Sequence, residues 1–132
     1  MDKIIINSSN YIIPQMRNEE MINFLKEIKY HKKFTYDYII TDWNDIELYN
    51  PITGSTKGVL DKDLNIIQGE GPRIEQFINE LKREIHIQEI KNELNKISDI
   101  PTHQMLLHQL ADIVGDDVVS EEFPEYNKGN NG

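Results

Sequence analysis

A long helical pattern in the second half of the chain constrains the fold more than any other feature. From Pro72 to Ile97, apolar residues recur at spacings of three and four, as in an amphipathic helix. A first stripe comprises Ile74, Phe77, Ile78, Leu81 and Ile85, and a second comprises Ile87, Ile90, Leu94 and Ile97. Continued at about 3.6 residues per turn, the first stripe would reach Gln88, Glu89 and Asn92, which are polar. The two stripes therefore face different directions, and one helix must cover two apolar surfaces.

The second stripe has two interpretations. A further helix is expected over residues 102–114, closed by Gly115 as its C-terminal cap. In one interpretation the first stripe packs on a sheet and the second packs on helix 102–114, which makes a helical hairpin. In the other, Ile87, Ile90, Leu94 and Ile97 form an interface with another chain, because large exposed apolar patches mark interfaces. Their spacing of three, four and three also suits a short coiled-coil seam.

The middle of the chain is rich in β-branched and aromatic residues interrupted by turn chemistry. Strands are expected within residues 36–43, 46–49, 58–60 and 64–67. An amphipathic helix is expected over residues 18–30, with Asn18 as its N-cap, and a strand or extended segment over residues 3–6 that reaches toward Ile13. These elements predict an α+β fold, in which a small antiparallel β-meander is flanked by an N-terminal helix and a C-terminal helical hairpin.

The end of the chain is acidic and then rich in asparagine and glycine. We predict one domain over residues 1–115 and a flexible tail over residues 116–132. Because Phe123 and Tyr126 lie among five carboxylates, a second interpretation is a short peptide that docks on a basic partner.

Charge and composition exclude several classes of function. The 132 residues carry a formal charge of −9, which disfavours direct binding to nucleic acid or to anionic membranes and favours a basic protein partner. There is no cysteine, which excludes disulfides and thiolate metal sites. With no apparent targeting segment or membrane span, a cytoplasmic or other intracellular location is expected, with association with a virion as the alternative. The preference for Ile, Asn and Lys over Ala matches AT-rich codons, as in a low-GC bacterium or its phage.

No motif for catalysis or cofactor binding is present, so we expect neither an enzyme nor a cofactor. The histidines, at positions 31, 86, 103 and 108, do not have the spacing of a metal pair on one helix face. The turn carboxylates Asp42, Asp45, Asp61 and Asp63 are the best candidates for a Mg²⁺ or Ca²⁺ site, but turns attract aspartate for backbone reasons. A metal-dependent enzyme is therefore the minor alternative.

The candidate partner-binding residues are Asp42, Trp43, Asp45, Glu47 and Tyr49, because tyrosine and tryptophan are favoured at binding hot spots and acidic surfaces suit basic targets. The favoured hypothesis is a non-catalytic protein that neutralises or regulates a macromolecular partner, of the immunity-protein or phage-inhibitor type. The alternative is a phage virion or tail component that forms a homo-oligomer through its C-terminal helices.

Overall fold

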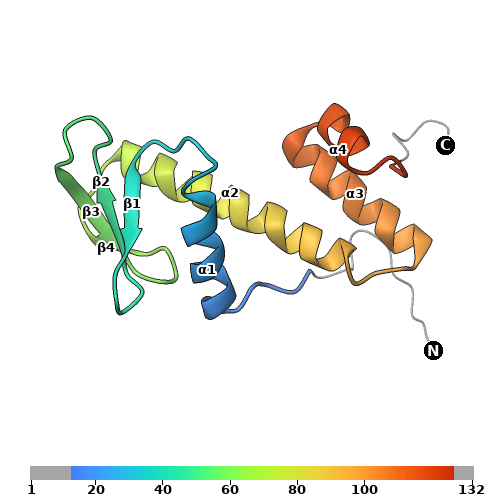
Figure 1. Cartoon of the computed structure of the whole chain (residues 1–132), viewed down its shortest axis with the longest axis horizontal. Coiled ribbons are helices and arrows are strands. Elements are labelled where there is room, and N and C mark those ends of the chain that lie inside the picture. Colours follow the sequence, from blue (N-terminus) through green and yellow to red (C-terminus); the bar gives the residue numbers. More distant parts are fainter. Residues whose placement is uncertain (1–12, 127–132) are drawn as a thin grey trace. The chain divides into compact units, whose positions relative to one another are not determined.

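A computed structural model describes residues 13–126 and confirms the α+β fold (Figure 1). The elements run in the order α1 (Asn18–Ile28), β1 (Asp37–Ile40), β2 (Ile46–Tyr49), β3 (Thr56–Leu60), β4 (Ile66–Gln68), α2 (Pro72–Leu94), α3 (Ile100–Val114) and α4 (Asp116–Glu122). The strand or extended segment expected over residues 3–6 lies outside the described residues. None of the helices within residues 13–126 is long and apolar enough to cross a membrane.

The chain divides into two units that share α2. The sheet unit comprises residues 16–85, and the described part of the helical unit comprises residues 13–15 and 86–126. The first stripe of α2 belongs to the core of the sheet unit, and the second stripe belongs to the core of the helical unit. The change of direction between the stripes is therefore the change from one core to the other.

The sheet is the antiparallel meander that the sequence predicts, with strand order β1-β2-β3-β4. The turns at residues 41–45 and 61–65 are built alike: in each, the N–H of the first residue donates to the carbonyl of the fifth, at 2.8 and 2.9 Å. The fourth residue of each turn has a left-handed backbone, with φ of 67° at Asn44 and 68° at Leu64. Because the strands form an antiparallel meander, the first and third connections, which are these two turns, lie at the same end of the sheet.

One face of the sheet is buried under α1 and the first stripe of α2. The rings of Tyr38 and Phe77 meet edge to face, with centroids 5.6 Å apart, and the Tyr38 hydroxyl donates to the carbonyl of Leu25 in α1. The loop before β1 is also tied to α2, because the N–H and hydroxyl of Thr35 donate to the two carboxylate oxygens of Glu80, at 2.9 and 2.7 Å. These contacts fix α1, the sheet and α2 around one core.

The helical unit confirms the hairpin interpretation of the second stripe. Ile87, Ile90 and Leu94 are buried in one cluster with Leu106, Leu107 and Leu110 of α3, and Ile97 is half-buried against it. At the start of α3, the Asp99 carboxylate accepts from the N–H of Thr102 at 3.0 Å. Gly115 ends the helix with φ of 101°, as its expected role as a C-terminal cap requires.

The segment for which a flexible tail was expected contains a short helix, α4, over Asp116–Glu122. Asp116 and Asp117 stand in the first turn of α4, where carboxylates are favoured, and Val119 is fully buried. The ring of Tyr126 is buried as well, and its hydroxyl donates to Asp116 Oδ1 at 2.6 Å. Two apolar anchors thus hold an acidic segment in place, and residues 127–132 lie outside the described residues.

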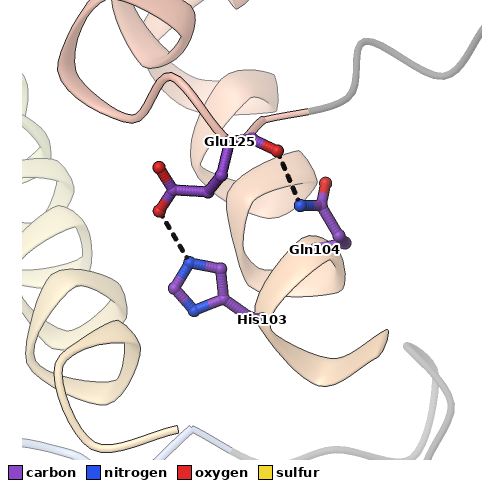
Figure 2. Close-up of polar contacts among 3 residues, drawn as sticks. All are labelled: His103, Gln104 and Glu125. Carbon is purple, nitrogen blue, oxygen red and sulfur yellow. Dashed lines mark hydrogen bonds and ion pairs between the residues drawn. The ribbon is translucent and has the colours of Figure 1, made fainter. Parts of the chain in front are cut away.

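Polar contacts fasten the last described residues to α3 (Figure 2). The Glu125 carboxylate lies 3.0 Å from Nε2 of His103, and the Glu125 carbonyl accepts from the Gln104 amide at 2.8 Å. Farther along α3, the ring of His108 packs edge to face on Tyr126. His103 and His108 therefore serve the packing of this segment.

Candidate partner-binding surface on the β1–β2 hairpin

The turn between β1 and β2 presents Trp43 to solvent. A compact hydrogen-bond pattern closes this turn, in which the hydroxyl of Thr41 accepts from the N–H of Asp45 at 2.9 Å and the carbonyl of Thr41 accepts from the N–H of Asn44 at 3.0 Å. The Trp43 side chain remains 75% exposed, and Asp42 beside it is exposed. The turn is thus held by backbone and Thr41 contacts, and the indole is left available for a partner.

Glu47 and Tyr49 lie together on the outer face of β2. Alternate residues of a strand point to the same side, and Ile46 and Leu48 point into the core. The Tyr49 hydroxyl donates to Glu47 Oε1 at 2.5 Å, and this hydrogen bond to a carboxylate raises the pKa of Tyr49. The sequence-predicted residues therefore fall into two groups: Asp42, Trp43 and Asp45 in the turn, and Glu47 with Tyr49 on the strand.

Apolar side chains that the sequence analysis did not single out also lie on the outer face. Ile39 pairs with Glu47 across the β1–β2 register and is 43% exposed. In β4, Ile66 and Ile67 are also exposed, at 40% and 56%. The run from Tyr38 to Ile40 is apolar throughout, and only the pairing register decides that its middle residue faces out.

The sheet region is strongly acidic. Residues 36–71 contain seven acidic and two basic side chains, which gives a net charge of −5. Asp42, Asp45 and Glu47 all lie within this segment, close in sequence to Trp43. An aromatic and apolar surface surrounded by negative charge suits a positively charged partner, because complementary electrostatic potentials increase the rate of association.

The turn carboxylates do not come together as metal ligands. Within residues 13–126, no group of three or more His, Asp or Glu side chains is placed to hold a metal ion. Asp61 instead caps its own turn, since Oδ1 accepts from the N–H groups of Asn65 and Asp63 at 2.9 and 2.8 Å. The hydrogen bond from the Asn65 backbone is the main cause that lowers the pKa of Asp61. Asp42, Asp45 and Asp63 likewise belong to the two turns.

The second set of predicted interface residues contributes to a core. Ile90 is fully buried, and Ile87 and Leu94 are 8% and 4% exposed. For Ile87, Ile90, Leu94 and Ile97 to contact another chain, α3 would first have to leave them.

Comparison with known proteins gives no family for this fold. No protein-family model, no curated protein and no solved structure matches the chain.

Proposed function

We propose that this chain is a non-catalytic acidic protein that binds a basic protein partner and so neutralises or regulates it. The hairpin patch, defined as Asp42, Trp43, Asp45, Glu47 and Tyr49, is the proposed contact surface. The observation that carries the proposal is the exposure of Trp43, which is 75% accessible within a hydrogen-bonded turn that also holds Asp42 and Asp45.

The exposed indole of Trp43 can contribute a large share of the free energy of binding. Tryptophan buries a large apolar area on binding, and it is enriched among the residues whose truncation costs an interface about 2 kcal/mol or more. In a monomer the same exposure has no benefit for folding. The closed turn holds the backbone under Trp43, so little conformational entropy is lost when the side chain docks.

The flanking carboxylates provide selectivity for a basic partner. Within residues 13–126, Asp42, Asp45 and Glu47 form no ion pair with a lysine or arginine, so no cation of this part of the chain neutralises their charges. The hydroxyl of Tyr49 donates to Glu47, which fixes the carboxylate without neutralising it. Arginine or lysine side chains around an apolar pocket would complement this surface.

A comparative capture experiment tests the proposal. The immobilised wild-type chain is exposed to an extract of the source cells beside a patch variant (Asp42→Lys, Asp45→Lys and Glu47→Lys) and a control variant (Glu27→Lys, Glu75→Lys and Glu121→Lys). The control makes the same change in charge at exposed positions elsewhere. We expect a basic protein that the wild type and the control retain and the patch variant loses. Equal retention by both variants would reject the patch as the binding surface.

The alternative, a virion or tail component that assembles through the second stripe, has weaker support. Ile90 and Leu94 are covered by α3 within the chain, and their substitution would disturb a core before it disturbed an interface.

A further inference from the structure

A polar pocket of about 430 Å³ lies within the sheet unit, between α1 and the turns of both hairpins. In Figure 1 the β1–β2 turn and the start of α1 lie at the same end of this unit. The pocket is lined by Asn18, Glu19, Ile22, Asn23 and Lys26 from α1, by Asn44 from the first turn and by Lys62 from the second. The meander places both turns at one end of the sheet, so distant parts of the sequence line one pocket.

The pocket collects hydrogen-bond donors that the fold leaves unused. Within residues 13–126, neither Lys26 nor Lys62 forms an ion pair, although the charge of Lys62 is one of the causes that lower the pKa of the neighbouring Asp61. The side-chain amides of Asn18, Asn23 and Asn44 form no hydrogen bond within the same residues.

Asn18 was expected to cap α1, but the structure gives that position to Arg17, whose N–H donates to Glu20 Oε1 at 2.9 Å. The Asn18 side chain is consequently available to the pocket. Ile22 is buried and closes the pocket from the side of the core.

A second pocket, of about 470 Å³, does not offer the same chemistry. Its lining residues all come from α2 and its first turn, and they include Glu75, Glu80 and Arg83. That pocket is therefore a groove along one helix, and its Glu80 carboxylate is already hydrogen-bonded to Thr35. The pocket at α1, in contrast, is lined by hydrogen-bond donors from three segments of the chain.

We propose that the pocket at α1 binds a small molecule that carries a phosphate monoester. The ammonium groups of Lys26 and Lys62 would neutralise the phosphate, and the amides of Asn23 and Asn44 would donate to its remaining oxygens. Glu19 is the one carboxylate in the lining, so the lining carries a net charge of +1 and suits a single phosphate better than a polyphosphate. The same carboxylate can accept from a hydroxyl of the ligand. The pocket adjoins the hairpin patch, because Asn44 stands between Trp43 and Asp45 in the same turn, but phosphate binding there requires no protein partner.

The test uses the full chain labelled with ¹⁵N and titrated with inorganic phosphate, followed by amide chemical shifts. Sodium chloride at matched ionic strength is the reference titration, because it reproduces charge screening without the hydrogen-bonding oxygens of phosphate. We expect saturable shifts at Asn23, Asn44 and Lys62 with phosphate alone. Shifts that grow linearly without saturation, or that chloride reproduces, would overturn the proposal.

Matched variants locate the site. Lys26→Gln and Lys62→Gln should each weaken phosphate binding roughly 3- to 10-fold, which is the range for losing one partly exposed charged contact. Lys82→Gln removes the same charge from an exposed position on α2 and should leave the affinity unchanged. All three residues lie at the surface of the fold, so the dispersion of the spectrum verifies folding in each variant. Equal weakening by all three variants would show non-specific attraction and would reject the pocket.

Discussion

Gly58 sets how closely β3 and β4 approach the start of α2. A Cβ at this position would lie 2.7 Å from the carbonyl oxygen of Gln68 and 3.2 Å from Cδ1 of Ile74. The first obstacle is backbone and the second is part of the core, so neither yields easily. We predict that Gly58→Ala lowers the free energy of unfolding by about 1–3 kcal/mol, as overpacking does.

Urea denaturation measures this loss, and Gly54→Ala is the comparison. No atom lies within 4 Å of a Cβ at Gly54, where φ is +76°, so alanine there should cost only the left-handed backbone penalty of about 1–2 kcal/mol. Unchanged stability of Gly58→Ala would show that β4 and α2 are not packed as described.

At the C-terminal end, Glu125 makes the helical unit sensitive to acid. Its pKa is lowered by a hydrogen bond to its own backbone and then by the hydrogen bond with His103. A carboxyl group whose pKa is lower in the folded state stabilises the fold above its unfolded pKa of about 4.3, and this contribution is lost as the pH falls through the folded pKa. We predict that Glu125→Gln flattens this part of the stability profile.

The measurement is the midpoint of chemical denaturation against pH from neutral to strongly acidic conditions. Glu121→Gln, at an exposed position on α4, is the control and should keep the wild-type profile. A wild-type slope in Glu125→Gln would mean that the contact with His103 does not contribute.

At the scale of elements, the sequence predicted the helices, strands and turns that a local pattern of residues determines. The phase change at Ile87 indicated two apolar surfaces on one helix, the break between residues 43 and 46 indicated a turn between two strands, and Gly115 indicated the end of a helix. Local pattern could not say which side of β1 is buried, because Tyr38, Ile39 and Ile40 are all apolar. It also could not reveal α4, since carboxylates dominate residues 116–125 and the burial of Val119 depends on α3 and α2.

Packing of α4 separates two neighbouring valines. Val119 is fully buried in the helical core, whereas Val118 is 48% exposed. Val119→Asp places a carboxylate without a partner in an apolar cluster and should lower stability by at least about 2 kcal/mol. Val118→Asp makes the same chemical change at the surface and should stay within about 0.5 kcal/mol of the wild type. Thermal unfolding followed by circular dichroism compares the two variants. Equal midpoints of unfolding would show that α4 does not pack on the helical core.

At the scale of the whole molecule, the two stripes of α2 are each covered by the same chain. Among residues 13–126, Ile90 and Leu94 are packed against α3, so the second stripe is not exposed to drive self-association. We predict that light scattering behind a sizing column gives the mass of one chain at every concentration. A combined Ile90→Asp and Leu94→Asp variant should lose helical structure. A fixed oligomer that this variant converts to a folded single chain would instead favour assembly through the second stripe.

The central claim is that the hairpin patch recognises a basic protein, and affinity for the captured partner tests it most directly. Isothermal titration calorimetry would compare the wild type, Trp43→Ala and the control triple variant (Glu27→Lys, Glu75→Lys and Glu121→Lys) with that purified protein. A hot-spot tryptophan is worth about 2 kcal/mol or more, so Trp43→Ala should weaken binding by roughly 30-fold or more, while the control keeps wild-type affinity within about threefold. Wild-type affinity in Trp43→Ala would contradict the account and move the binding surface elsewhere on the molecule.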